Sequence, residues 1–276
     1  MNLNTISTVK RPADAGEIRS WQAGYAWLAG GTWLFSEPQP ATHTLIDLER
    51  LHWPSVQVSA EGLDIAATCR IAELYRLQGP PEWTALPLLR ECCNALLASF
   101  KIWNTATVGG NICMSLPAGA MISLVVALEG SLTLWPRRGA PRVIPAVDFV
   151  TGNHQNVLEP GELLRSIHLP ASALSKRYAI RRASLVKLGR SAALLIGTRG
   201  ADGKLLVTIT ASTPRPVQLA FPGIPSADEL RRAIDEAIPE DGYFDDVNGR
   251  PDYRRHVSYY FAEQIRVELA QPGEAA

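Results

Sequence analysis

The sequence has few cysteines, and none of them stands at a spacing typical of a metal centre. The 276 residues include four cysteines, with no C-x-x-C pair and no cysteine and histidine cluster. This argues against a zinc or iron–sulfur centre carried by this chain, and against a disulfide framework. We expect unmetallated thiols that pack as small apolar side chains, at Cys69, Cys92, Cys93 and Cys113.

Long apolar runs and an excess of charge of one sign are also missing. The longest apolar runs, 121–128 and 192–196, are far too short to cross a bilayer, and residues 1–10 lack the basic-then-apolar order of a secretory signal. Lys and Arg together number 27, as do Asp and Glu, so no charge excess favours nucleic acid or an anionic membrane as a partner. We therefore expect a cytoplasmic protein that handles small molecules.

The sequence does contain the mixed periodicities of an α+β protein. Alternating or continuous apolar patterns predict strands at 25–28, 44–48, 56–58, 63–66, 131–135, 164–169, 178–182 and 205–211. Helical spacing predicts helices at 13–23, 72–77, 86–99, 121–128, 227–237 and 253–269. The patterns divide the chain into three parts, 1–52, 53–171 and 172–276.

Two short loops share a pattern that suits a phosphate ligand. Residues 28–32 and 106–111 each have an apolar lead-in, paired glycines and a threonine. Paired glycines allow positive φ and close approach to a ligand, so that successive N–H groups can form an anion-holding concavity. Two such loops would suit a pyrophosphate. Neither matches the G-x-G-x-x-G fingerprint or a P-loop, which argues against a Rossmann NAD site and an NTPase.

Taken alone, a paired-glycine loop is more often a plain structural turn, and only the occurrence of two related loops favours a function. Neither loop contains lysine or arginine, so backbone dipoles would have to meet the phosphate charge. A predicted helix after the second loop, with Pro117 near its first turn, could add its positive end.

These segments resemble the FAD-binding (medium) subunits of molybdenum hydroxylases, the xanthine dehydrogenase and carbon monoxide dehydrogenase flavoprotein family. Residues 28–34 resemble the family's AGGTDL loop, and residues 107–112 with 117–119 resemble its T[IV]GGN…SPAGD loop. The similarity extends along most of the chain, through the segments 9–12, 159–170, 187–194 and 252–256.

The resemblance implies a vanillyl-alcohol-oxidase (PCMH) type FAD-binding fold. Two α+β subdomains, 1–52 and 53–171, would hold extended FAD between them, and a small C-terminal α+β domain, 172–276, would cover the flavin. Family members take electrons from an iron–sulfur subunit, which is fed by a molybdopterin subunit, and pass them to NAD or another acceptor. The implied role is an oxidoreductase subunit of a heteromeric complex, with FAD as cofactor and no metal or catalytic residue of its own.

The resemblance also implies site residues, position by position. One side of the pyrophosphate would be held by Ala29, Gly30, Gly31, Thr32 and Trp33, and the other by Thr107, Gly110 and Asn111. Ile102 would border the adenine or ribityl region, Leu164 would pack on the isoalloxazine, and Lys187 would approach the pyrimidine edge, where a cation stabilises the reduced anion. From the residues alone, Leu164 is as well explained by core packing, and Lys187 by a solvated surface position.

Two positions depart from the family pattern. Ala120 stands where an aspartate commonly follows SPAG, and Trp33 replaces the usual aspartate of the first loop. Losing one charge-assisted hydrogen bond would cost about 1.5–3 kcal/mol of FAD binding. Two other interpretations stay open: a non-catalytic scaffold subunit with weak or lost FAD binding, and a stand-alone flavin oxidoreductase, for which 276 residues leave little room.

Overall fold

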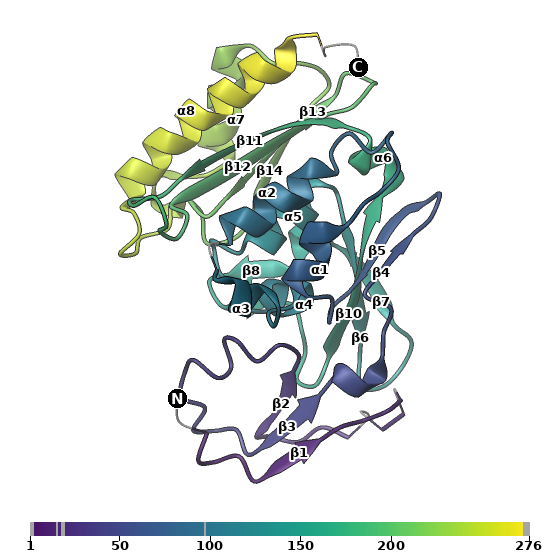
Figure 1. Ribbon diagram of the computed structural model, residues 1–276. Coiled ribbons are helices and arrows are strands. Elements are labelled where there is room, and N and C mark those ends of the chain that lie inside the picture. The colour runs from purple at the N-terminus through teal and green to yellow at the C-terminus, as the bar shows by residue number, and fades with distance from the viewer. Residues whose placement is uncertain (1–2, 15, 18–19, 97, 273–276) are drawn as a thin grey trace.

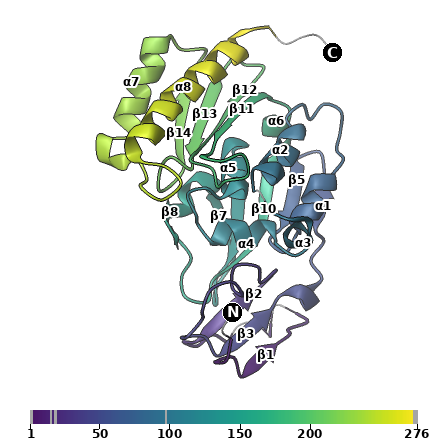
Figure 2. The same ribbon diagram turned by 60° about the vertical axis from the view of Figure 1, so that its left-hand side comes forward.

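The structure is a computed structural model that describes residues 3–14, 16–17, 20–96 and 98–272. Its strands form a three-stranded, a five-stranded and a four-stranded sheet, together with a short two-stranded one. Figures 1 and 2 show these sheets following one another from the N-terminal end to the C-terminal helices. In the described part of the chain, no helix has the length and apolar character needed to cross a membrane. Helices and sheets are mixed along the chain, which confirms the predicted α+β class.

The N-terminal sheet is parallel and contains β1 (Thr8–Lys10), β2 (Tyr25–Leu28) and β3 (Thr44–Asp47) in the order β1-β3-β2. All of β3 is buried, as expected for the central strand of the three. Residues 29–34, which we call loop one, leave this sheet at the carboxyl end of β2. The strand thereby directs loop one toward the rest of the molecule.

The central sheet is antiparallel, with the strand order β4-β5-β10-β6-β7. Its strands are β4 (Val56–Val58), β5 (Gly62–Ala66), β6 (Ser131–Trp135), β7 (Arg142–Pro145) and β10 (Leu163–Pro170). Alternate side chains of these strands, among them Leu63, Ile65, Ile167 and Leu169, are fully buried in the main hydrophobic core. Because β10 lies in the middle, its first residues are held in a fixed position beside loop one.

Helices cover the central sheet and separate it from the C-terminal sheet (Figure 1). They are α1 (Ile71–Arg76), α2 (Pro87–Ala95), α3 (Phe100–Trp103), α4 (Val108–Cys113), α5 (Ala120–Ala127) and α6 (Ala171–Leu174). Every residue of α5 is buried, because this helix packs against α2 and α4 on one side and the C-terminal sheet on the other. A helix that is apolar all round needs such an environment.

The C-terminal sheet is an antiparallel meander of β11 (Arg177–Ala183), β12 (Ala193–Arg199), β13 (Leu205–Thr210) and β14 (Val217–Phe221). Its outer face is covered by α7 (Ala227–Ala237) and α8 (Pro251–Ala270) (Figure 2). Along β12 the side chains alternate between two cores: Leu195 faces α8, whereas Leu194 and Ile196 face the central core. The remaining short elements are β8 (Val150–Gly152), β9 (Gln155–Asn156) and three 3₁₀ turns, 49–51, 146–148 and 240–242.

Several predicted elements differ from the structure. The described residues within 13–23 form turns rather than a helix, while positions 15, 18 and 19 lie outside the described residues. Here the Asp14 carboxylate accepts the N–H groups of Gly16 and Glu17 at 2.6 and 3.2 Å, a local turn that competes with helix formation. The predicted helix 86–99 is shorter, since α2 ends at Ala95.

Candidate functional site

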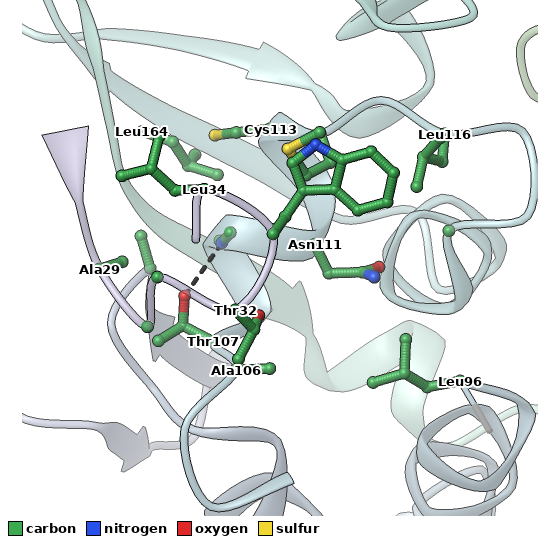
Figure 3. A pocket seen from close by; sticks show the side chains of 18 of the residues that line it. Ala29, Thr32, Leu34, Leu96, Ala106, Thr107, Asn111, Cys113, Leu116 and Leu164 are labelled. Carbon is green, nitrogen blue, oxygen red and sulfur yellow. Dashed lines mark hydrogen bonds between the residues drawn. The ribbon is translucent and has the colours of Figure 1, made fainter. Parts of the chain in front are cut away.

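A cavity of about 710 Å³ lies where the three parts of the chain meet (Figure 3). Its walls come from loop one, from α4 and the residues around it, from the start of β10 and from residues 188–191 between β11 and β12. This volume lies within the range of about 300–1,000 Å³ typical of small-molecule and cofactor sites. The cavity is therefore large enough for a ligand that contacts all three parts.

Most of the predicted site residues line this cavity, namely Ala29, Gly30, Gly31, Thr32, Trp33, Ile102, Thr107, Gly110, Asn111 and Leu164. Lys187 does not line it and is exposed on the segment between β11 and β12. Two neighbours of Lys187, Leu188 and Arg190, do contribute to the wall. Residues as far apart in sequence as Trp27 and Ser191, 164 positions, thus share one cavity.

Loop one presents a row of backbone N–H groups with no protein partner. None of the N–H groups of residues 30–34 donates to an acceptor in the described part of the chain. Gly31 has a φ of 68°, which an L side chain rarely adopts, and a Cβ at Gly30 would overlap the carbonyl oxygen of Thr105. Glycine is therefore needed at Gly31 for a left-handed backbone conformation and at Gly30 for close packing against the backbone of Thr105. Successive free N–H groups of this kind form an anion-binding concavity.

The second glycine pair has another structure. It lies in the first turn of α4, and neither Gly109 nor Gly110 has a positive φ. The N–H of Gly110 donates to Thr107 Oγ1 at 3.0 Å, and those of Val108 and Gly109 donate to carbonyls of the segment 67–69. The prediction of a paired-glycine loop at 106–111 is therefore wrong, because residues 108–113 form α4. A helix N-cap uses the N–H groups that a turn would have left free.

Side chains near α4 supply donors instead (Figure 3). The hydroxyl groups of Thr32 and Thr107 donate to no acceptor in the described residues, and the same holds for Nδ2 of Asn111. Asn111 is held in place because its Oδ1 accepts the Met121 N–H at 3.0 Å, at the start of α5. Ala120 is fully buried and does not line the cavity, so the position of the family's aspartate offers no ligand-binding group here.

The apolar part of the wall includes two tryptophans that join the N-terminal part to the central one. Trp27 donates from Nε1 to the carbonyl of Glu162 at 3.1 Å, and the ring of Trp33 lies 5.7 Å from that of His154 in the β8–β9 turn. Leu164 is 1% exposed and belongs both to the main core and to the cavity wall. The cavity thus combines a polar loop with a largely apolar wall.

Residues 5–172 match the family of the FAD binding domain in molybdopterin dehydrogenase. The chain belongs to this family. The match covers more than half of the chain and includes loop one, α4 and the start of β10, so the resemblance described from the sequence is confirmed. The cofactor of the family is FAD, as predicted.

Two curated relatives illustrate the family. The carbon monoxide dehydrogenase medium chain of Hydrogenophaga pseudoflava is 29% identical over 149 residues, which are 54% of this chain and 49% of the relative. The caffeine dehydrogenase subunit beta of Pseudomonas sp. (strain CBB1) is 30% identical over 136 residues, 47% of this chain and 43% of the relative. The chain spans about half the length of the curated relatives it matches.

Solved structures resemble the chain over nearly its whole length. A reconstituted CO dehydrogenase from Oligotropha carboxidovorans aligns with a TM-score of 0.79 and 22% identity over 98% of this chain and 99% of the other. Quinoline 2-oxidoreductase from Pseudomonas putida 86 aligns with a TM-score of 0.76 and 18% identity over the same shares. These likenesses confirm the predicted fold class, an α+β fold of the PCMH type.

The donors of the cavity fit the FAD that characterises the family. The run of free N–H groups at 30–34 and the hydroxyls of Thr32 and Thr107 suit a pyrophosphate. Glu162, the acidic side chain on the cavity wall, is paired with Arg142 through two hydrogen bonds of 2.7 Å. Those bonds lower the pKa of Glu162, although burial raises it. The charge of the carboxylate is thus balanced by Arg142, so Glu162 is no free negative charge beside an anionic ligand.

A thiol also lines the cavity. Burial raises the pKa of Cys113 to about 12, so that the sulfur stays protonated and weakly nucleophilic at neutral pH. In the described residues no three His, Cys, Asp or Glu side chains are grouped to hold a metal ion.

Among the lining residues that sequence reasoning missed are Trp27, Glu162 and Arg190. A signal for two of them existed, since Glu162 and Arg190 lie inside segments that resemble the family, 159–170 and 187–194.

Proposed function

We propose that this chain is the FAD-binding electron-transfer subunit of a xanthine dehydrogenase-like molybdenum hydroxylase, which passes electrons from an iron–sulfur subunit through FAD to NAD or another acceptor. The observation that carries the proposal is the row of unpaired N–H groups at 30–34 on the same cavity as the free hydroxyl of Thr107. Membership of the FAD-binding family supports it.

In this proposal loop one and α4 bind the pyrophosphate from two sides. The N–H groups of 30–34 donate to phosphate oxygens without any rearrangement, because no protein acceptor competes for them. The hydroxyls of Thr32 and Thr107 and the Asn111 amide add donors at fixed positions. We assign residues 1–52 and 53–171 to holding FAD and 172–276 to covering it, since 188–191 complete the cavity wall.

FAD supplies the capacity to accept electrons one at a time and to release them in pairs. The protein contributes position and environment. Leu164 and Ile102 provide apolar surface against which planar groups pack, and Trp27 and Trp33 tie the N-terminal part to the central one across the cavity. The charges that line the cavity act more strongly on a bound group than they would in bulk water.

The proposal also requires partner subunits. The relatives named above are a medium chain and a beta subunit, designations of multi-subunit enzymes. The four cysteines of this chain show no iron–sulfur spacing. We therefore assign the iron–sulfur centres and the molybdopterin to separate subunits of the same complex, with this chain performing only the flavin step.

The proposal is tested by purifying the chain alone and together with the iron–sulfur and molybdenum subunits of the proposed complex. We expect a yellow chain that releases intact FAD on denaturation and reduces a dye with a heteroaromatic substrate only in the reconstituted complex. A chain that stays colourless after incubation with FAD would instead identify a scaffold subunit. Substrate turnover by the isolated chain would identify a stand-alone flavin oxidoreductase.

A further inference from the structure

The flavin cavity carries one uncompensated charge. Among the described residues that line it, Glu162 and Arg190 are the charged ones. Glu162 is neutralised by Arg142. Arg190 makes no ion pair, hydrogen bond or ring contact within the described part of the chain. Because a guanidinium stays protonated at every accessible pH, the wall contains a permanent positive charge without a protein counter-ion.

The backbone on both sides of Arg190 is fixed by a second arginine. Arg182, on β11, donates from Nε to Ser191 Oγ at 2.8 Å and from Nη2 to the carbonyl of Gly189. Ser191 is 3% exposed, so this anchor is shielded from water. Burial lowers the pKa of Arg182, and its hydrogen bonds go to uncharged groups. Arg182 therefore positions the segment while leaving the charge of Arg190 free.

A third arginine, from a distant helix, anchors the next residue of the chain, Ala192. Arg254, near the start of α8, donates from Nη1 to the carbonyl of Ala192 at 2.8 Å and is 1% exposed. Ala192 in turn donates its N–H to the carbonyl of Ala183 at 2.8 Å, which closes the segment 184–191 at its base. The residues at 189 and 191–192 are thus held by two arginines from two elements.

The part of the segment that carries Lys187 lies outside this anchoring. Lys187 is exposed and does not line the cavity, and Leu185 and Val186 beside it are 59% and 65% exposed. The segment therefore has a part that lines the cavity, at Leu188, Arg190 and Ser191, and a part at 185–187 that does not. Lys187 and Arg190 are both exposed, so contact with the cavity is what distinguishes them. Its two cations, Lys187 and Arg190, fall on different parts.

We propose that Arg190, positioned by Arg182, is the cation that stabilises the negative charge gained by the flavin on reduction, and that Lys187 is not. Two electrons and one proton give the isoalloxazine one net negative charge. A guanidinium on the cavity wall without a protein counter-ion lowers the free energy of that charged form and leaves the neutral oxidised form nearly unaffected. The inference rests on the proposed function, because it requires FAD in this cavity.

The test uses the full-length chain reconstituted with FAD and compares the wild type with Arg190→Gln, Arg190→Lys and Lys187→Gln. FAD affinity is measured by titration of the apoprotein, and the flavin midpoint potential by equilibration with reference dyes. We expect Arg190→Gln to disfavour the reduced form at least tenfold, about 30 mV for a two-electron couple. Arg190→Lys should retain most of the wild-type potential, and Lys187→Gln should match the wild type.

Several outcomes would overturn the inference. A loss of FAD affinity in Arg190→Gln with an unchanged potential would mean that Arg190 pairs with the pyrophosphate. A shifted potential in Lys187→Gln alone would assign the role to Lys187. A wild-type chain that binds no FAD would overturn the proposed function as well, whereas bound FAD with a potential independent of residue 190 would overturn the inference only. Far-ultraviolet circular dichroism checks that each variant is folded.

Discussion

Asn111 and Met121 lie on consecutive helices and are joined by one hydrogen bond, in which the Met121 N–H donates to Oδ1 of Asn111 at 3.0 Å. The bond satisfies an N–H in the first turn of α5, which would otherwise lack a partner. It also fixes the amide so that Nδ2 remains available on the cavity wall. One side chain therefore serves both the fold and the candidate FAD site, and the two roles can be separated by substitution.

Asn111→Asp keeps the acceptor for Met121 but replaces the free donor by a negative charge on the cavity wall. We expect the dissociation constant for FAD to rise at least tenfold, about 1.4 kcal/mol, while the midpoint of thermal unfolding of the apoprotein stays within a degree or two of the wild type. Asn111→Ala should lose the cap as well, at about 1 kcal/mol of folding free energy. Equal FAD affinity in the wild type and Asn111→Asp would show that this side chain does not face the cofactor.

The glycines of α4 provide a matched pair of substitutions. A Cβ at Gly109 would lie 2.7 Å from both Cα and the carbonyl oxygen of Ala67, a backbone that cannot yield easily. A Cβ at Gly110 would meet only Thr107 Oγ1, at 2.9 Å. We expect Gly109→Ala to destabilise the apoprotein in urea titrations by about 1–3 kcal/mol, as overpacking of a core does. Gly110→Ala should instead disturb the Thr107 hydroxyl and weaken FAD binding with little loss of stability. A large loss of stability in Gly110→Ala, together with weakened FAD binding by a stable Gly109→Ala protein, would contradict these contacts.

Local sequence signals predicted much of the fold, and they failed where distant contacts decide. Loop one could be predicted, because a strand followed by paired glycines and threonine is a local pattern. The glycines of α4 could not be interpreted correctly, since the need for Gly109 arises from packing against Ala67. β12 was not predicted beyond its apolar run 192–196, because a strand buried on both faces lacks polar alternation.

The cation of the site shows the same limit. Lys187 and Arg190 are three positions apart in one segment, and nothing in the local pattern tells which one reaches the cavity. The anchors that decide it are Arg182 on β11 and Arg254 on α8, the latter 62 positions from its partner Ala192. A resemblance transferred position by position could name the segment but not its cavity-facing side.

Adjacent arginines of α8 should differ sharply in their effect on stability. Arg254 is 1% exposed and donates to the carbonyls of Ala192, Ala211 and Gly249 and to the Asp246 carboxylate. We expect Arg254→Met to cost about 3–5 kcal/mol in urea unfolding, because the carbonyls and a partly buried carboxylate lose their partner.

The matched control is Arg255→Met. The Arg255 side chain is 42% exposed, and its ion pairs with acidic residues of α7 and the 240–242 turn are solvated, so we expect a much smaller loss of stability. Similar losses in the two variants would show that the buried network of Arg254 contributes little.

The Arg142–Glu162 pair predicts a defined dependence of stability on pH. The hydrogen bonds from Arg142 lower the pKa of Glu162 below its ordinary value of 4.5, with burial opposing and the Glu159 N–H assisting. The folded state therefore keeps this carboxylate ionised at a pH where the unfolded chain has already bound a proton. The resulting stabilisation is complete above pH 4.5 and is lost as the pH falls toward the lowered pKa of the folded state, with a slope of up to about 1.4 kcal/mol per pH unit.

Urea unfolding between pH 3 and 7 isolates this contribution. Glu162→Gln should be less stable than the wild type at pH 7, and the difference between the two should shrink as the pH falls below 4.5. Arg142→Gln leaves a carboxylate that is 3% exposed without its partner, so its loss should also be largest at pH 7, about 2–3 kcal/mol, and should decrease as Glu162 becomes protonated. The figure is below that of a fully buried pair because the Arg142 side chain is 41% exposed. If the loss in free energy of unfolding relative to the wild type were the same from pH 3 to 7 in both variants, the Arg142–Glu162 pair would not be a source of the pH dependence of stability.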